Sequence, residues 1–573
     1  MNKLLLPFFL FLGITFHLSS VASPMVWVEF RDKENSPYTL ENPGDFLSQR
    51  SLERRLKNNI PLDFYDLPVS PAYVETLTTD LEEQLKLYYT SRWFNGALFE
   101  VNDELVTDLI SDYEFVKSVE VVKPSLSQKP EKNTEQDEDS SSTQSVNNNT
   151  PSNGSFKFPR VHYTAMDEDN FYYQNDEVME FIELVNGQYL HDKGYNGQGT
   201  IITVLDSGFK DVDKMEGFRY LWDTGKIMGY HDFVNPRGSI FDTHTHGTSV
   251  LSVMAGMLNQ DYRGGAPDAY YYLVRTEDAS TEFRIEEYNW LAGAEYADSV
   301  GADIINSSLG YSEFDDSAQN YIYNDLNGET TVAARAANMA FDRGILVVNS
   351  AGNYGNNNWQ YIGTPADALG TLAIGGTDNQ GERVSFSSIG PTADGRIKPD
   401  VMAQGRSVPV ISISDQVMNA NGTSFASPLM AAMAACLLQK HPEATNEQLR
   451  NAITRSADKY FNPDNFYGYG IPDFEAASLI LQQEQKNQNI VSLSVNPISQ
   501  KSSLKFFLEH EDKVMVELFN SKGHLVLRTN QLDANPGYNE IKPFTDVNSL
   551  ASGIYFIRIG FSDRNELIKA IKL

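Results

Sequence analysis

Four short motifs carry the side chains that could perform chemistry together. The apolar run TIITVL ends in Asp206, and His246 opens the segment HGTS. Asn353 lies in the glycine-rich segment NSAGNYG, and Ser424 lies in NGTSFASP. A serine, a histidine and an aspartate held together perform nucleophilic acyl transfer, because the histidine takes the serine proton and the aspartate orients the ring. An asparagine amide beside them can donate a hydrogen bond to the oxyanion that forms.

Each of these residues also has an ordinary structural interpretation. Asp206 could cap a turn, Asn353 could belong to a glycine-rich turn, and Ser424 could cap a helix. A lone His-Gly-Thr at 246 is a weak signal. The context favours catalysis, because each motif lies where a strand meets a loop or a helix. Catalytic groups of open parallel sheets collect at the carboxyl ends of the strands. We therefore expect the four residues to meet at one edge of a sheet.

The serine motif is the most specific of the four. Six fixed residues of the pattern Gly-Thr-Ser-x-Ala-Ser-Pro begin at Gly422 and lead into the apolar run LMAAMAACLLQKH. We expect Pro428 in the first turn of a helix, where its missing N–H costs nothing. Ser424 then lies at the helix N-terminus, whose dipole favours negative charge on the nucleophile and on the oxyanion. Its backbone N–H could serve as a second oxyanion donor.

Two further groups allow other chemistry. Asp242 and His244 lie close to His246 in the sequence and could bind a metal, since Asp and His are good ligands. The set lacks a partner motif with metal-ligand spacing, so we favour the catalytic interpretation. The one cysteine, Cys436, lies in an apolar run. We expect it to be a buried core residue rather than a catalytic thiol, and it excludes an intrachain disulfide.

The region that must position these motifs, residues 159–484, predicts an α/β domain. Continuous apolar runs such as TIITVLD, YYYLVR, ADIINSS, GILVVNSAG and TLAIGG alternate with helical patterns such as YNWLAGAEYADSVG. Apolar runs without polar alternation are typical of parallel strands that are covered on both faces. We therefore expect a doubly wound parallel sheet.

The remaining segments differ from this region in pattern. Residues 23–124 mix short strands and helices, which predicts a small α+β domain. Residues 125–158 are polar and acidic, which predicts a disordered, flexible linker. Residues 490–573 return to strands bounded by turns, which predicts a β-sandwich. Residues 1–22 combine a short positive start, an apolar run and small residues at the end, which favours a signal peptide over a transmembrane helix.

The composition limits the classes of partner. The 573 residues include 45 basic and 77 acidic side chains, and the formal net charge is −32. Such a surface repels phosphate backbones, which argues against a nucleic-acid partner, and it disfavours adhesion to anionic membranes. Hydrophobic residues make up 41% of the chain, enough to bury a large core.

The order Asp206, His246, Ser424 resembles that of the subtilisin-like (S8) peptidase family. Several other segments are similar to that family: GAPDA at 265–269, SLG at 308–310, FSS at 386–388 and KPDV at 398–401. The resemblance covers residues 190–475. Family members often carry histidine directly after HGT, whereas this chain has Ser249, at a position that is not catalytic.

The resemblance implies a role for each motif. Ser424 would be the nucleophile, His246 the base, Asp206 its orienting carboxylate and Asn353 the oxyanion donor. Ser308, Leu309 and Gly310 would form the substrate-binding strand. The segment GTPA at 363–366 would help to line the pocket for the side chain before the scissile bond.

The outer segments resemble known companions of these peptidases. Residues 23–124 are similar to the propeptide of Bacteroidetes-type subtilases, which folds against the protease and inhibits it. The segments VNP at 495–497, VELFNSKG at 516–523, LASGIYF at 550–556 and the terminal LIKAIKL resemble the type IX secretion sorting domain. An ordinary β-sandwich binding module is the alternative for this end, since the architecture alone carries no function.

Together these resemblances imply a secreted or surface-exposed serine endopeptidase, made as a zymogen. Its partners would be polypeptide substrates, its own propeptide as inhibitor, and the type IX secretion machinery. No cofactor is required for the chemistry; structural calcium fits the family, but the sequence has no EF-hand-like loop and assigns no ligands. A catalytically silent subtilase fold used as a surface binding module is an alternative, as is a dedicated processing protease.

Overall fold

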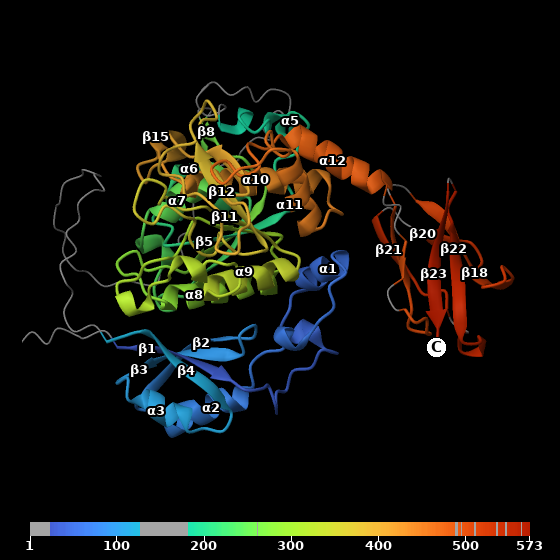
Figure 1. The fold of residues 1–573 in the computed structure, drawn as a ribbon, viewed down its shortest axis with the longest axis horizontal. Helices are drawn as coiled ribbons and strands as arrows, with labels where there is room; N and C mark the ends of the chain where they lie inside the picture. Colours follow the sequence, from blue (N-terminus) through green and yellow to red (C-terminus); the bar gives the residue numbers. More distant parts are fainter. Residues whose placement is uncertain are drawn as a thin grey trace, which may run out of the picture.

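The computed structural model describes residues 23–125 and 181–573, apart from 260–261, 488–490, 494–495, 509–510, 535–536, 545–546 and 563. The predicted signal peptide and the predicted linker beyond Ser125 lie outside the described residues. Three units follow one another along the chain: an amino-terminal unit (23–125), a central unit (181–487) and a carboxy-terminal unit (491–573) (Figure 1).

The central unit is built on a seven-stranded sheet in the order β13-β12-β11-β10-β5-β9-β6, and every neighbouring pair is parallel. The strands are β5 (Ile201–Asp206), β6 (Ile227–Asp232), β9 (Tyr270–Arg275), β10 (Ile304–Ser307), β11 (Leu346–Ser350), β12 (Thr371–Thr377) and β13 (Val401–Gln404). The predicted doubly wound parallel sheet is therefore confirmed. The segment IMGYHD was not among the predicted strands, because β6 is the edge of the sheet and lacks the continuous apolar run of its buried neighbours.

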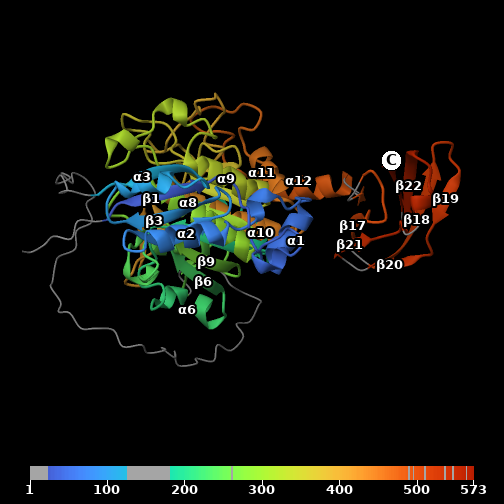
Figure 2. The ribbon, with the colours of Figure 1, turned by 90° about the horizontal axis from the view of Figure 1, so that it is seen from below.

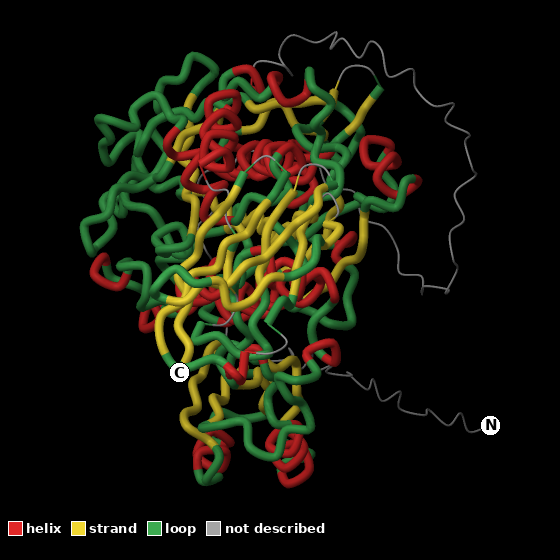
Figure 3. Tube along the Cα trace, turned by 90° about the vertical axis from the view of Figure 1, so that its right-hand side faces the viewer, coloured by secondary structure: helices red, strands yellow, loops and turns green. Residues whose placement is uncertain are grey.

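Helices cover both faces of this sheet (Figure 3). Residues of α7 (His246–Ala255) and α10 (Thr423–Lys440) share one core with Val204 and Ile304. Residues of α8 (Ile285–Val300) and α9 (Val332–Asp342) share a second core with Leu205 and Ile305. Successive strand residues thus enter opposite cores, as a pleated strand requires. The other described α-helices of the unit are α5 (Gln188–His191), α6 (Glu216–Asp223), α11 (Asn446–Arg455) and α12 (Phe474–Asn487). None of the described helices combines the length and apolar character needed to cross a bilayer.

Helix α10 begins earlier than the sequence predicts. It starts at Thr423, so Pro428 lies inside the helix and not in its first turn. Proline has no N–H, and therefore it cannot bond the carbonyl of Ser424 four residues before it. The Ser308 hydroxyl donates to that carbonyl instead, at 2.9 Å. A side chain from the end of β10 thus replaces the missing helical bond.

The amino-terminal unit is an antiparallel sheet in the order β2-β3-β1-β4 with three helices. Its elements are β1 (Met25–Phe30), α1 (Gln49–Lys57), α2 (Pro71–Asp80), β2 (Leu85–Ser91), β3 (Gly96–Val101), α3 (Val106–Ser111) and β4 (Val116–Lys123). Val26 and Val28 enter the core of this unit, whereas Trp27 and Leu98 pack with residues of α8 and α9. One face of the sheet therefore rests on the central unit (Figures 1 and 2).

The carboxy-terminal unit lies beyond the end of α12 (Figure 1). It has one sheet in the order β16-β17-β21 and another in the order β19-β18-β22-β23, with β20 paired to β18. Its strands are β16 (Ser492–Leu493), β17 (Leu504–Leu508), β18 (Asp512–Asn520), β19 (Leu525–Arg528), β20 (Leu532–Ala534), β21 (Gly537–Ile541), β22 (Gly553–Gly560) and β23 (Asn565–Lys572). Residues of both sheets, including Phe506 and Ile557, share one core.

Candidate functional site

The structure brings the four motifs to the carboxyl edge of the parallel sheet. Asp206 is the last residue of β5, and Asn353 follows the end of β11. His246 is the first residue of α7, and Ser424 is the second residue of α10. The two helices pack against the same face of the sheet, so their first residues approach the strand ends together.

A short hydrogen bond joins Asp206 to His246. The distance between His246 Nδ1 and Asp206 Oδ1 is 2.8 Å, and Asp206 is fully buried. The same carboxylate oxygen accepts the backbone N–H of Ser207 at 2.8 Å. Because a carboxylate is an acceptor only, Nδ1 must carry the proton, and Nε2 of the neutral ring is left as a base.

Two glycines allow this close approach. A Cβ at Gly247 would lie 2.3 Å from the carbonyl oxygen of Gly208 and 3.0 Å from Asp206 Cβ. Gly208 has a φ of +153°, and a Cβ there would lie 2.0 Å from Thr243 Oγ1. The start of α7 can therefore lie directly over the end of β5.

The surroundings of His246 favour its protonated form. Burial of the ring is the largest influence and disfavours the charge, but the charge and hydrogen bond of Asp206 outweigh it, with Glu277 adding to them. Together they raise the pKa of His246 above its ordinary value. An imidazolium formed during catalysis would therefore be stabilised.

Ser424 lies against the segment predicted to bind substrate. It is buried, and its Oγ lies 3.5 Å from the carbonyl oxygen of Ser308. The carbonyl of Leu309 accepts the side-chain amide of Asn349 at 2.9 Å, which fixes the segment to the end of β11. The backbone of the segment that begins at Ser308 thus runs directly past Ser424.

Asn353 is oriented by the serine motif itself. Its Oδ1 accepts the backbone N–H and the hydroxyl of Thr423, each at 3.0 Å. With the carboxamide oxygen held in this way, Nδ2 lies beside Gly422, 3.5 Å from where a Cβ of that residue would be. Asn353 is exposed, so its amide can donate to a group bound next to Ser424.

The alternative chemistries receive less support from the geometry. His244 Nδ1 lies 3.1 Å from the Ser207 hydroxyl and accepts the N–H of His246 at 3.2 Å, while Asp242 is exposed. Cys436 is buried and its Sγ lies 3.3 Å from the carbonyl of Gly265, and burial raises the pKa of its thiol. Within the described residues, three candidate metal ligands gather at a different place, formed by Glu277, Glu282 and Glu286.

A buried charge cluster between the amino-terminal and central units has no counterpart among the sequence motifs. Asp298 of α8 pairs with three arginines of the amino-terminal unit. Arg55 Nη1 lies 2.7 Å and Arg92 Nη2 2.5 Å from its carboxylate oxygens, and Arg54 is also paired with it. Burial alone would raise the pKa of Asp298, but the three guanidinium groups lower it. No local pattern shows this cluster, because its partners are more than 200 residues apart.

A second carboxylate of α8 holds the turn between β2 and β3. Glu295 accepts the backbone N–H groups of Arg92 and Trp93 at 3.0 and 3.2 Å, and also the hydroxyl of Ser91. Trp93 is itself buried. Helix α8 therefore binds the amino-terminal unit both through charge and through its backbone.

Comparison with known proteins gives matches for each of the three units. The subtilase family (peptidase S8) model matches residues 197–470, the Bacteroidota peptidase S8 propeptide domain matches 25–139, and the secretion system C-terminal sorting domain matches 496–572. These matches confirm the three resemblances inferred from the motifs.

Individual relatives match the central part of the chain. Subtilisin NAT of Bacillus subtilis subsp. natto is 30% identical over 327 residues, which is 56% of this chain and 76% of that protein. The thermostable alkaline protease of Halalkalibacterium halodurans is 30% identical over 291 residues, which is 51% of this chain and 70% of that protein. The crystal structure of MycP1 from the ESX-1 type VII secretion system is 21% identical, with a TM-score of 0.42, over 55% of this chain and 88% of that chain.

Proposed function

Because this chain belongs to the subtilase family of serine peptidases and carries a propeptide domain, we propose that it is a secreted endopeptidase, made as a zymogen, whose nucleophile is Ser424. The observation that carries this proposal is the Nδ1–Oδ1 hydrogen bond of 2.8 Å between His246 and Asp206. It occurs at the carboxyl edge of the sheet, where Ser424 is the second residue of α10.

The chemistry follows from these positions. His246 Nε2 takes the proton of Ser424 Oγ as that oxygen attacks the carbonyl carbon of the peptide bond. Asn353 Nδ2 and the N–H of Ser424 donate to the oxyanion of the tetrahedral intermediate. His246 then gives its proton to the leaving amine, and the C–N bond breaks. A water molecule repeats the sequence on the acyl-enzyme and releases the acid, while Asp206 holds the ring throughout.

Substrate would bind as an added strand along Ser308, Leu309 and Gly310. Main-chain hydrogen bonds of this kind depend on the peptide backbone more than on its side chains. Tyr311 continues the segment and pairs with Thr364, with N···O distances of 2.9 and 3.1 Å. We expect residues 363–366, which contain that partner, to line the pocket for the side chain before the scissile bond.

The other two units set when and where the enzyme acts. The amino-terminal unit would inhibit the enzyme from its position on α8 and α9, until cleavage in the predicted linker at 125–158 releases it. The sorting domain indicates secretion or attachment at the cell surface. A signal peptide at 1–22 and a type IX export route complete this proposal. None of the chemical steps needs a cofactor; a structural calcium ion, if one is bound, would act on stability.

A serine-directed fluorophosphonate tests the proposal against a catalytically silent subtilase fold. The mature protein should be labelled and should hydrolyse casein, and Ser424→Ala should lose both properties while keeping the same thermal unfolding midpoint. If Ser424→Ala still hydrolysed casein, Ser424 could not be the nucleophile. Mass spectrometry of the fully active secreted enzyme tests the zymogen proposal. Residues 23–124 still covalently attached to that enzyme would refute it.

A further inference from the structure

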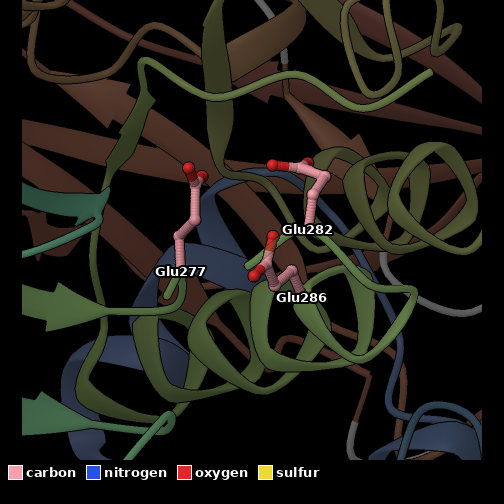
Figure 4. Close-up of side chains that lie close together, drawn as sticks. All are labelled: Glu277, Glu282 and Glu286. Atoms are coloured by element: carbon pink, nitrogen blue, oxygen red, sulfur yellow. The ribbon is translucent and has the colours of Figure 1, made fainter. Parts of the chain in front are cut away.

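Three glutamates gather near the first turn of α8 (Figure 4). Glu277 follows the end of β9, Glu282 lies in the next loop, and Glu286 is in the first turn of α8. A carboxylate oxygen from each lies within 4.8 Å of the other two. Three negative charges this close repel one another unless a cation or a proton lies between them.

The buried member of this cluster is poorly partnered. Glu286 is 1% exposed, and no described donor lies in full hydrogen-bond geometry with either carboxylate oxygen; the backbone of Asp278 acts on it only weakly. The Tyr311 hydroxyl is a second buried polar group without a hydrogen-bond partner among the described residues, and Tyr311 is also 1% exposed. The glutamates act electrostatically on Tyr311, so the two features lie together. Buried polar groups without partners are costly and point to a polar ligand.

The cluster lies along the path expected for a substrate. Glu277 is close enough to His246 to influence its charge. Tyr311 follows Gly310 directly, and the Tyr354 hydroxyl donates to the carbonyl of Gly310 at 3.2 Å. From Ser308, which contacts Ser424, three residues of extended chain reach Tyr311, a span of about 10 Å.

From this arrangement we propose that Glu277, Glu282 and Glu286 bind the positively charged side chain of an arginine or lysine in the substrate. The inference rests on the proposed peptidase function. A peptide lying antiparallel to residues 308–310 runs from the cluster toward Ser424. The basic residue therefore lies two to four positions before the scissile bond.

The surroundings favour a basic side chain over a metal ion. Calcium takes six to eight oxygen ligands, whereas the planar fork of arginine is satisfied by a few acceptors and stacks on tyrosine rings. Glu277 and Glu282 are half-buried, which leaves a way in for a side chain. Lys123, at the end of β4, already lies near, with Nζ 4.0 Å from the Asp278 carboxylate and 5.8 Å from the centre of the Phe283 ring.

Arg284 and Arg275, which lie near this cluster in the sequence, are engaged elsewhere. Arg284 Nη1 lies 3.6 Å from the Glu120 carboxylate, and its guanidinium lies 4.7 Å from the centre of the Tyr321 ring. Arg275 Nη1 lies 3.2 Å from Asp232, and its Nη2 lies 3.8 Å from Asp278. Its Nε donates to the carbonyl of Ser207 at 3.1 Å. Its positive charge is therefore shared with other carboxylates, and the glutamate cluster can accept a second cation.

The test compares arginine with citrulline, which has nearly the same shape but no charge. Fluorogenic peptides carry arginine or citrulline two, three or four positions before the scissile bond. The value of kcat/KM for each peptide is measured with the naturally processed enzyme. Wild type should prefer arginine about ten- to hundredfold at one position, the range for hydrogen bonds between charged groups. Glu286→Gln should reduce that preference below about threefold. Glu313 is an exposed carboxylate near Tyr354, and the control variant Glu313→Gln should retain the preference for arginine.

Each other result overturns the inference in a recognisable way. Equal cleavage of all arginine and citrulline peptides by wild type removes the basic subsite and leaves the peptidase intact. Calcium that raises the unfolding midpoint of wild type but not of Glu286→Gln, without an arginine preference, makes the cluster a metal site. Failure to cleave any peptide or to react with fluorophosphonate removes the peptidase function and the subsite with it. Should Glu286→Gln not fold, Glu282→Gln at the half-buried position gives the same comparison.

Discussion

The Arg55 guanidinium binds the Asp298 carboxylate at two points, with Nη1 2.7 Å from Oδ1 and Nη2 2.8 Å from Oδ2. Arg55 belongs to the propeptide domain, and Asp298 belongs to the peptidase domain. Both side chains are at most 2% exposed. Removing one partner of a buried ion pair typically costs about 3–5 kcal/mol, because the other charge stays buried without compensation. This contact should therefore dominate the affinity between the two domains.

Replacing Asp298 should weaken inhibition by the propeptide. In Asp298→Asn, three arginines lose their shared carboxylate, and we expect the inhibition constant of separately added residues 23–125 to rise about hundredfold. Arg50→Ala is the matched control, since Arg50 pairs with Asp303 at 2.6 Å but is 40% exposed. It should change the constant less than about fivefold. Similar losses for both variants would contradict a dominant role for the buried cluster.

The acid limit of activity should lie above the ordinary pKa of histidine. His246 must be neutral to accept the Ser424 proton, and Asp206 and Glu277 raise its pKa despite its burial. The value of kcat/KM should therefore fall as the pH decreases through a midpoint above about 6.5. Glu277→Gln removes one stabilising carboxylate, so its midpoint should move to lower pH, whereas Glu313→Gln should leave it in place. A profile that stays flat down to pH 4 would exclude a histidine base.

Removing the amide of Asn353 should slow the chemical step. Asn353→Ala loses the proposed oxyanion donor, and we expect kcat to fall roughly 10²–10³-fold with little change in KM, a magnitude known from subtilisin itself. Asn353→Asp retains the oxygen that accepts from Thr423 but cannot donate a hydrogen bond. Its kcat should therefore fall at least as far as that of Asn353→Ala. Steady-state kinetics on one peptide separate the effect on kcat from the effect on KM. A rise in KM at constant kcat would instead give Asn353 a role in substrate binding.

The sequence was sufficient for the residues whose position depends on local pattern. Asp206 ends an apolar run and His246 starts a helix, and both assignments depend on strand and helix boundaries that the pattern shows. The parallel sheet was predicted for the same reason. Pro428 was misplaced, because the start of α10 depends on the Ser308 hydroxyl, which lies 116 residues away from the carbonyl that it bonds.

Other features could not be found from the sequence because their meaning depends on burial. Arg54 and Arg55 lie in a charged stretch of α1, where the sequence favours exposure, yet both are buried against Asp298. Glu286 is an ordinary residue for the first turn of a helix, where acidic side chains favour the dipole. That neither of its carboxylate oxygens has a well-placed donor is visible only once the folded chain brings Glu277 and Tyr311 around it.

A methyl group at residue 247 should separate the base from its carboxylate. In Gly247→Ala the new Cβ would lie 2.3 Å from the carbonyl oxygen of Gly208, a backbone atom that cannot rotate away. The start of α7 must therefore shift, and the 2.8 Å bond between His246 and Asp206 must lengthen. Misplacement of a catalytic group by 1 Å can cost about 100-fold in rate, so we expect kcat to fall by that order at nearly constant KM. Ser249→Ala, two residues later on the same helix, is the control and should keep full activity; equal kcat in both variants would show that α7 tolerates the methyl group.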